Sequence, residues 1–523
     1  MSEFRVLFVY PNQRAETLVP PSIAIFSALL KEHGFTVDLF DSTHYDLDAD
    51  DYISTNFTKN RDDTAGLVQN LLVRPYESKA DTLQKHESAV EGLKKKIEAF
   101  KPGLIAVTTT ESTYLLAIQL LDTIQSHNIP TIYGGVFTTF APELALSFPQ
   151  VDMVCVGEGE NCIVELSERL RDGKDYKDVT NLWLKEKDGT IIKNSVTDPV
   201  DVDSIPRADF EIFEDGQFYR PMFGKLYKML PVETHRGCPY TCAFCNSPAQ
   251  NVFYSKETGK SFFRKRSMEK IREDLLYFRD VINIEYVYFW ADTFFAWSER
   301  EIDEFCEMYS DIKLPFWCQT CVETVTDERI KKLKKIGLHF MAFGMEHGNE
   351  KFRAEVVHRK YSNQSAIDAL KIPKKYGVPF AVNNIIGFPG ETRELSFDTI
   401  ELNRQFQADQ MSCSIFQPYI GTPLRPICVD AGFLHADTLC PANSENTVMK
   451  LPTYTPDQLI GLKRTFAMYV RFPKSRWPDI EIAEKLTPEG DEMWAKLSKE
   501  FSEEFFSSPE TDITEQGNPI PLQ

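Results

Sequence analysis

The chain has no long apolar run. Nowhere in its 523 residues is there a stretch of the roughly 18–20 apolar residues that a bilayer-spanning helix needs. Its first residues, Met1-Ser2-Glu3, lead straight into the strand-like segment Phe4–Tyr10 and show no signal-peptide pattern. We therefore expect a protein without a membrane span, located in the cytoplasm, where thiols stay reduced.

The chain has fewer basic than acidic residues. The chain carries 58 Lys and Arg against 78 Asp and Glu, for a net charge of −20. A general nucleic-acid-binding protein needs a basic face to gain from counterion release, so we expect no nucleic-acid partner. The one dense basic run, Arg264-Lys265-Arg266, is typical of a solvated helix start.

Cysteine is sparse, and its 11 copies are scattered, which is unlike a disulfide framework. Three of them nevertheless fall together, as Cys238, Cys242 and Cys245, in the spacing C-x3-C-x2-C. A [4Fe–4S] cluster usually takes four thiolates. A loop that offers three leaves one iron open to a substrate or cofactor, as catalytic zinc sites keep one position free.

A structural zinc site is the alternative for these thiols. Zinc would need a fourth Cys or His at ribbon spacing, and the next cysteine, Cys306, is far outside it. His235 is separated from Cys238 by Gly237, which is unusual for a zinc ligand pair. The spacing favours a cluster, and a non-catalytic zinc-binding module stays open as the alternative.

The first third of the chain alternates between strand and helix patterns. This alternation predicts an α/β, doubly wound sheet whose ligand lies beyond the carboxyl ends of the strands. The predicted strands are Arg5–Tyr10, Phe35–Phe40, Leu104–Thr108, Thr131–Tyr133 and Met153–Val156, with helices over Ser22–His33, 87–100 and Tyr114–His127. Small residues at or near strand ends would let a large flat ligand approach the backbone: Pro20-Pro21, Thr108-Thr109-Thr110, Gly134-Gly135 and Gly157-Glu158-Gly159-Glu160.

After an irregular linker at 199–226, a second strand–helix series begins. With a first strand leading into the cysteine loop, six units predict an open, partial (β/α)6 barrel over 227–425, with its chemistry at the carboxyl ends of the strands. The later strands are expected at 286–290, 315–320, 339–344, 381–387 and 412–416. Residues 426–523 predict helices at Thr455–Val470 and Ile480–Phe506 and a disordered polar tail from Ser507.

These patterns resemble a known family. The cysteine spacing, with Phe244 before the last cysteine, resembles the radical S-adenosylmethionine (SAM) enzymes, over about 227–425. The strand ends of residues 4–170 are similar to the cobalamin-binding domain of the B12-dependent members, with Gly157–Glu160 the most specific element. The resemblance implies a Rossmann-like cobalamin domain at 1–198, a [4Fe–4S] cluster, SAM and cobalamin.

The resemblance also implies roles for single residues. Cys238, Cys242 and Cys245 would hold the cluster and take part in catalysis. SAM would be contacted by Phe244, Asp292, Glu346, Asn384, Gly387 and Glu391, and cobalamin by Pro21, Thr108, Thr110, Gly134, Gly135, Gly157, Glu158 and Gly159.

Two SAM motifs depart from the family pattern. Ala291 replaces the first residue of a frequent Asp-Asp pair, and the Gly387 element has Asn383 for its first Gly and one extra residue before Glu391. Glu391 is therefore equally explained as a charge at a helix N-terminus.

The lower-ligand histidine of the best-known B12 domains is missing. The loop Asn12–Val19 contains no His, and His44 lacks the spacing of the D-x-H-x-x-G motif. We predict no histidine on the lower face of cobalamin. A domain that has lost the cofactor would show the same sequence pattern, and this alternative stays open.

The resemblance implies methylation of an unactivated carbon of a small molecule, through a 5′-deoxyadenosyl radical and methylcobalamin, with electrons from a flavodoxin- or ferredoxin-type donor. Oxidative cyclisation or ring rearrangement on the same architecture is the alternative. A tRNA methylthiotransferase is disfavoured, because the first 170 residues hold only Cys155 and Cys162. Cys318 and Cys321 form a CxxC pair on a predicted strand, where they would face opposite sides, and we expect both in the core.

Overall fold

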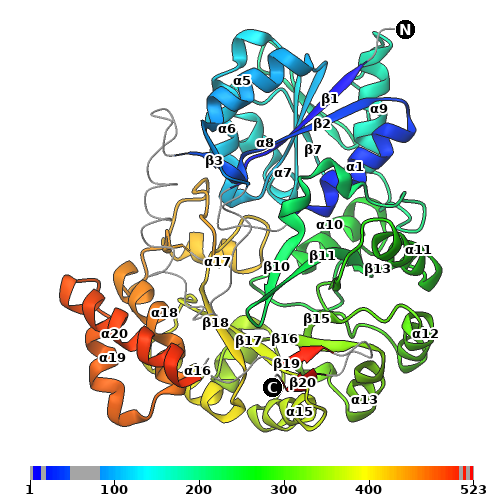
Figure 1. Cartoon of the computed structure of the whole chain (residues 1–523). Coiled ribbons are helices and arrows are strands. Elements are labelled where there is room, and N and C mark those ends of the chain that lie inside the picture. The colour runs from blue at the N-terminus through cyan, green and yellow to red at the C-terminus, as the bar shows by residue number, and fades with distance from the viewer. Residues whose placement is uncertain are drawn as a thin grey trace.

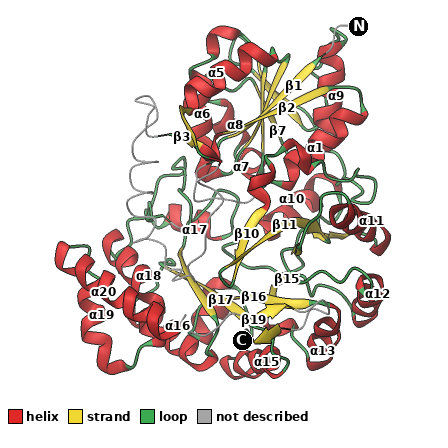
Figure 2. Cartoon of the chain, in the orientation of Figure 1, coloured by secondary structure: helices red, strands yellow, loops and turns green. Residues whose placement is uncertain are grey.

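The computed structural model describes residues 4–12, 19–47, 83–443, 445–505, 511–513 and 519–521. Two seven-stranded sheets, one above the other, form its main body (Figure 1). Helices cover the strands of both sheets, and the C-terminal helices gather beside the lower one (Figure 2). Within these ranges no helix is both long and apolar enough to cross a membrane.

The upper sheet has the strand order β2-β1-β5-β6-β7-β8-β9. Its first five strands are parallel, and β8 and β9 add an antiparallel edge that the sequence patterns did not predict. The strands are β1 (Arg5–Tyr10), β2 (Thr36–Asp41), β5 (Leu104–Thr108), β6 (Thr131–Gly134), β7 (Met153–Cys155), β8 (Leu182–Lys185) and β9 (Ile191–Lys193). The chain leaves β1 toward β2 on one side and later adds β5 on the other. This strand order places a ligand crevice at the carboxyl ends of β1 and β5.

Helices cover both faces of this sheet because its central strands are apolar on both sides. Val6 and Phe8 pack in one core with α1 (Pro21–Glu32) and α9 (Glu160–Arg171). Leu7 and Val9 pack in another with α5 (Ala89–Phe100), α6 (Tyr114–Asp122), α7 (Val136–Phe140) and α8 (Pro142–Leu146). The predicted doubly wound fold is confirmed. Helix α6 is shorter than predicted and gives way to a 3-10 turn at Gln125–His127.

The lower sheet is the predicted partial barrel. Its order is β10-β11-β14-β15-β16-β17-β18, with β10 antiparallel and the other six parallel. The strands are β10 (Tyr219–Met222), β11 (Lys225–Glu233), β14 (Tyr286–Trp290), β15 (Phe316–Cys321), β16 (Leu338–Glu346), β17 (Phe380–Ile386) and β18 (Gln410–Ile415). Helices α10 (Asn246–Thr258), α11 (Met268–Asp280), α12 (Glu299–Tyr309), α13 (Asp327–Ile336), α15 (Asn363–Lys375) and α16 (Arg393–Phe406) follow these strands.

Strand β10 lies inside the segment predicted to be an irregular linker. It pairs with β11 through a two-residue turn in which both Phe223 and Gly224 have positive φ, 53° and 89°. Such turns match the twist of a hairpin. The sequence gives only a weak indication of this hairpin, because a Phe at the first position of such a turn is unusual.

The C-terminal helices are α17 (Leu424–Asp430), α18 (Pro456–Arg471), α19 (Trp477–Ala483) and α20 (Pro488–Phe505). Helix α18 packs against β18 and α16 and so covers the open edge of the barrel. The predicted helical stretch Ile480–Phe506 is two helices, broken at 484–487. In the predicted disordered tail, Thr511–Ile513 and Pro519–Pro521 form a short antiparallel pair, and the remaining tail residues lie outside the described ranges.

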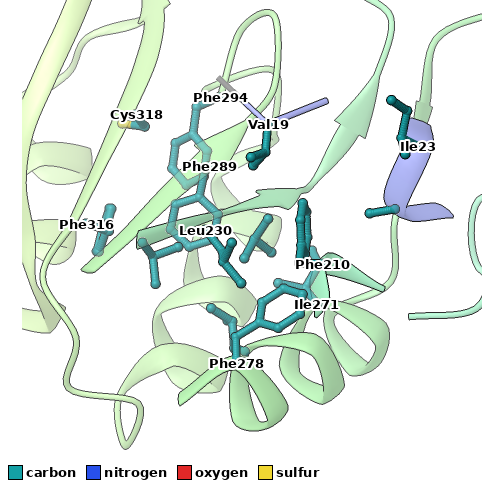
Figure 3. Packing of buried hydrophobic residues seen from close by; sticks show 14 of the residues in the cluster. Val19, Ile23, Phe210, Leu230, Ile271, Phe278, Phe289, Phe294, Phe316 and Cys318 are labelled. Atoms are coloured by element: carbon teal, nitrogen blue, oxygen red, sulfur yellow. The ribbon is translucent and has the colours of Figure 1, made fainter. Parts of the chain in front are cut away.

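One apolar core runs through both sheets. This core contains Phe8 of β1 and Leu230 of β11. It also contains Phe210, which belongs to the segment between β9 and β10, here called the connecting segment. The Phe210 ring meets that of Phe278 edge-on at a centroid distance of 5.6 Å. Figure 3 shows Phe210 next to Ile271 and Phe278 of α11. The connecting segment is therefore packed between the two domains.

Candidate functional site

The cysteine loop sits at the carboxyl end of β11. It follows the short strand β12 (His235–Arg236), and Cys245 is the N-cap residue of α10. Gly237 has a φ of 84°, and a Cβ there would lie 2.8 Å from the Phe262 ring, so the turn into the loop needs glycine. A helix N-terminus favours negative charge, so α10 would stabilise thiolates beside it.

Burial dominates the electrostatics of the three thiols. The pKa of Cys242 and that of Cys245 are raised to about 12, mainly by burial and to a lesser extent by the neighbouring cysteines. Burial also raises the pKa of Cys238, while Thr293 lowers it. Thiols of this kind lose their protons when a metal binds them. Within the described ranges no three or more His, Cys, Asp or Glu side chains gather around a single-ion position.

Asp292 and Thr293 follow β14 and border the cysteine loop. The Asp292 carboxylate accepts a hydrogen bond from the Ser247 hydroxyl in the first turn of α10. Surrounding protein atoms raise the pKa of Asp292 although the residue is solvent-accessible. The structure thus brings Asp292 to the cysteine loop, and its contact with SAM stays a prediction.

Cys318 and Cys321 lie in different surroundings. Cys318 is fully buried among apolar side chains (Figure 3). Cys321 instead ends β15 beside the cysteine loop, where Thr293 Oγ1 lies 3.5 Å from its Sγ and 3.5 Å from Cys238 Sγ. Both cysteines are buried and face opposite sides of the strand, as expected. Cys318 packs in the apolar core, whereas the alternation of the strand turns Cys321 toward the inside of the barrel.

Glu346 ends β16 in a strained backbone. Its φ is 66° although it is not a glycine, and the pairing of β16 with β17 shifts register there. Such outliers cluster at functional sites. The side chain folds back over Gly344, where a Cβ would lie 2.1 Å from Glu346 Oε1. Burial raises the pKa of Glu346 to about 7, against the lowering effect of Arg359.

Arg359 is a buried cation that the sequence analysis missed. Its Nη2 lies 2.9 Å from Glu323 Oε2, and its Nη1 lies 3.9 Å from both Glu346 Oε1 and Cys242 Sγ. Only 4% of it is exposed. It stands 117 positions after Cys242, in a segment without any motif, so no local pattern could have identified it.

The Gly387 loop joins the site through aromatic contact. The Phe244 ring of the cysteine loop meets the Phe388 ring at 6.4 Å. Gly387, at a φ of 82°, turns the chain there. The predicted adenine-side residues Phe244 and Gly387 thus lie on adjoining loops.

Glu391 holds that loop together. Its Oε2 accepts backbone hydrogen bonds from Gly387 at 2.7 Å and Phe388 at 3.0 Å, and its Oε1 accepts one from the Ser396 hydroxyl at 2.5 Å. It is fully buried. Its Oε1 also lies 3.4 Å from His347 Nε2. The predicted direct contact of this side chain with SAM is corrected, because both oxygens face protein groups of the loop, α16 and His347. It is not a simple helix-terminal charge either.

Asn384 points away from the barrel interior. It exchanges hydrogen bonds with Asn403 of α16 and is 1% exposed. The neighbouring Asn383 faces the other side, where its Oδ1 accepts a hydrogen bond from Ser412 Oγ at 2.7 Å. The predicted SAM contact of the Asn384 side chain is therefore corrected, because the alternation along β17 turns Asn383, and not Asn384, toward the inside of the barrel.

A cavity of about 750 Å³ lies at the carboxyl ends of the upper sheet. All eight residues predicted to contact cobalamin line it: Pro21, Thr108, Thr110, Gly134, Gly135, Gly157, Glu158 and Gly159. At Gly135 a Cβ would lie 2.1 Å from Thr109 O, whereas at Gly134 it would meet no atom within 4 Å. A wall of backbone and small side chains of this kind fits a large flat ligand.

The opposite wall of the cavity belongs to the barrel and the segments after it. Trp290 at the end of β14, Arg236, Asn246 and Tyr419 are among its lining residues. No histidine stands among the described lining residues, and His44 is not one of them. The lower-ligand loop falls largely on residues 13–18, outside the described ranges.

Known proteins match both halves of the chain. Residues 232–402 match the radical SAM superfamily, and residues 79–167 match the B12 binding domain. An uncharacterized methyltransferase of Pyrococcus horikoshii is 29% identical over 73% of this chain and 82% of its own length. An anaerobic magnesium-protoporphyrin IX monomethyl ester cyclase of Rubrivivax gelatinosus is 24% identical over 62% of this chain, which spans only 58% of that relative.

Two solved structures share the whole architecture. The radical SAM methyltransferase TsrM of Kitasatospora setae, with cobalamin and a [4Fe–4S] cluster bound, superposes with a TM-score of 0.61 at 14% identity, covering 95% of this chain and 100% of that one. The cobalamin-dependent SAM radical enzyme OxsB, with aqua-cobalamin and SAM bound, gives 0.63 at 15% identity, over 97% and 72%. These likenesses confirm the fold.

Proposed function

We propose that this chain, which belongs to the cobalamin-dependent radical SAM enzymes, methylates an unactivated carbon of a small molecule. The single observation that carries the proposal is the shared cavity. The small-residue wall of the upper sheet and the barrel residues Trp290 and Arg236 line one space. Asn246, which directly follows Cys245, also lines this space, so a cobalamin held on the upper wall would face a substrate at the mouth of the barrel, beside the cysteine loop.

The residues present fit each cofactor. Cys238, Cys242 and Cys245 would hold the cluster and leave one iron open. Asp292 and Glu346 would bind the amino and ribose groups of SAM, while Phe244 and the Gly387 backbone would border its adenine. The eight lining residues of the upper sheet would hold cobalamin. When bound, the cluster and SAM supply a 5′-deoxyadenosyl radical, and methylcobalamin supplies the methyl group.

Other residues orient the predicted SAM contacts and line the inside of the barrel. Arg359 holds the Glu346 carboxylate toward the cysteine loop and compensates its buried charge. Glu391 fixes the turn at Gly387 and Phe388. The aromatic rings of Trp290, Tyr288 and Trp317 occupy the inside of the barrel, and Tyr288 and Trp317 are stacked at 5.7 Å. This lining favours an uncharged or hydrophobic substrate. A cytoplasmic location and an external flavodoxin- or ferredoxin-type donor complete the proposal.

A cyclase or rearrangement reaction is the second candidate, because relatives matching 62% and 64% of this chain are cyclases. The two candidates differ in the fate of the SAM methyl group. Anaerobic reconstitution with iron, sulfide and cobalamin, followed by incubation with methyl-deuterated SAM and metabolite extracts, separates them by mass spectrometry.

A methyltransferase would transfer the deuterated methyl group to a product. A cyclase would form 5′-deoxyadenosine without label transfer. Protein that takes up iron but no cobalt would refute methyl transfer through cobalamin, and protein that takes up zinc alone would refute both candidates.

A further inference from the structure

Two acidic residues of the Gly157–Glu160 loop reach from the upper domain to the barrel. Glu158 Oε1 lies 2.8 Å from Arg236 Nη1 and 2.6 Å from Arg264 Nη2, and Glu160 Oε1 lies 2.6 Å from the same Arg236 nitrogen. Glu158 Oε2 also accepts a hydrogen bond from Arg264 Nη1 at 2.9 Å. None of the four side chains is more than 17% exposed. We call this set, Glu158, Glu160, Arg236 and Arg264, the interdomain clamp.

Both arginines belong to the strand pair that leads into the cysteine loop. Arg236 on β12 stands opposite Arg264 on β13 (Arg264–Lys265) in an antiparallel pair. Arg236 is followed by Gly237 and Cys238. Glu158 therefore binds two cations that the β12–β13 pairing holds side by side, in a forked geometry that tolerates little displacement.

The acidic side of the clamp belongs to the cobalamin wall. Glu158 is flanked by Gly157 and Gly159, and all three line the cavity. A second link runs parallel to the clamp, because the backbone N–H of Glu158 donates to the Tyr254 hydroxyl at 2.6 Å. Tyr254 is part of α10, the helix that begins after Cys245. Each end of the clamp is thus one or two residues from a group that would touch a cofactor.

Breaking one partner of a buried ion pair leaves an uncompensated charge and is strongly unfavourable. The two loops therefore have one favourable relative position. We propose that the interdomain clamp is a positioning device that sets the separation between cobalamin on the upper sheet and the cluster on the barrel. This inference rests on the proposed function, since it needs both cofactors to be bound.

The test uses Arg264, which lies outside the cavity lining. In Arg264→Met the forked pair is lost, and Arg264→Lys keeps the charge without the fork. Arg272→Met is the matched control, because Arg272 forms a similar double contact with Asp311, both at 2.6 Å, on the barrel exterior. The full-length proteins are reconstituted with cluster and cobalamin, and their iron content, cobalamin Kd and electron paramagnetic resonance (EPR) spectra are compared.

The decisive readout is the relaxation enhancement of cob(II)alamin by the reduced cluster, which falls steeply with the distance between the two spins. We expect Arg264→Met to keep its iron, to bind cobalamin about tenfold more weakly and to lose part of the enhancement. Arg264→Lys should be intermediate and Arg272→Met unchanged. If Arg264→Met does not fold, Glu158→Gln tests the same pair with its shape retained.

The outcomes separate the two claims. A wild-type protein that binds no cobalamin would refute the proposed function, and this inference with it. A wild type that binds both cofactors, with the same relaxation enhancement in Arg264→Met or Glu158→Gln, would overturn the positioning role alone.

Discussion

Arg359 Nη1 lies 3.9 Å from the Sγ atom of Cys242, so a buried guanidinium donates toward one of the three thiols predicted to hold the cluster. Hydrogen bonds to sulfur and nearby positive charge are among the factors that set cluster potentials. They stabilise the extra electron of the reduced form.

We therefore expect Arg359→Met to shift the midpoint potential of the cluster to more negative values, and Arg359→Lys to shift it less. An EPR-monitored potentiometric titration measures both. Arg272→Met is the control, because Arg272 pairs with Asp311 at 2.6 Å on the barrel exterior. An unchanged potential in Arg359→Met would refute the electrostatic role.

The cysteines divide into cluster ligands and bystanders. Replacement of Cys238, Cys242 or Cys245 by Ala should abolish most iron binding after anaerobic reconstitution, because a compact loop has no spare thiolate. Cys318→Ala should keep its iron, since Cys318 is fully buried in the apolar core. Iron and sulfide analysis of the four variants decides the matter, and iron retention in Cys238→Ala would contradict the assignment.

Glu346 should make SAM binding depend on pH. Burial raises the pKa of Glu346 to about 7, so below that pH the side chain is neutral and a weaker acceptor for the SAM amino group. We expect the Kd for SAM to rise up to about tenfold for each pH unit below the pKa. Calorimetric titrations at several pH values would measure it.

Glu346→Gln should remove the pH dependence of SAM binding that Glu346 causes, while any titration of SAM itself affects both proteins equally.

The raised pKa of Glu346 also makes the stability of the folded protein depend on pH. The folded state binds the proton more tightly than the unfolded chain, so stability is lost as pH rises from the ordinary value of 4.5 through about 7. Glu346→Gln should therefore unfold at a higher temperature than the wild type at pH 8, and a lower one would contradict the buried-acid assignment.

Glu391 should matter for stability. Glu391→Ala would leave the backbone N–H groups of Gly387 and Phe388 without their acceptor, whereas the Ser396 hydroxyl keeps the Tyr454 hydroxyl as a partner at 2.7 Å. Unsatisfied buried donors cost about 1–3 kcal/mol each, so we expect the two backbone groups to cost about 2–6 kcal/mol in denaturant unfolding. Glu394→Ala, at an exposed position in the first turn of α16, should change stability by under about 1 kcal/mol. Equal effects would show that Glu391 is not the acceptor that holds the loop.

The adjacent glycines Gly134 and Gly135 separate folding from binding. Gly135→Ala would place a Cβ 2.1 Å from Thr109 O at a φ of 131°, so the upper domain should be destabilised. Gly134→Ala meets no protein atom within 4 Å and should fold normally, while its methyl group occupies the cavity wall and weakens cobalamin binding. Thermal melts and cobalamin titrations of both variants check this, and normal cobalamin affinity in Gly134→Ala would remove Gly134 from the contact set.

Much of this architecture can be predicted from local sequence patterns. Apolar runs such as those of β1 and β14, with the turn residues at their ends, predict the parallel strands of both sheets, because buried parallel strands have a distinct composition. The antiparallel strands β8, β9 and β10 lack this composition and were not predicted. The cysteine loop was predictable for a different reason, since its chemistry depends on spacing alone.

Tertiary relationships were beyond local patterns. The distance between Arg359 and Cys242 depends on where two strand ends meet, and nothing near Arg359 in the sequence records it. The sequence pattern did not decide which of Asn383 and Asn384 faces the inside of the barrel, because a shift of one residue reverses the face of a strand. Glu158 was predicted at the cavity, but its two arginine partners lie on elements whose pairing only the folded chain displays.

The apolar core that unites Phe8, Phe210 and Leu230 bears on how the chain comes apart. Because the connecting segment is packed on both sides, separating the halves would expose Phe210 and Phe278 to water at once. Heating should therefore melt the two halves in one cooperative transition, and a fragment cut at the connecting segment should aggregate.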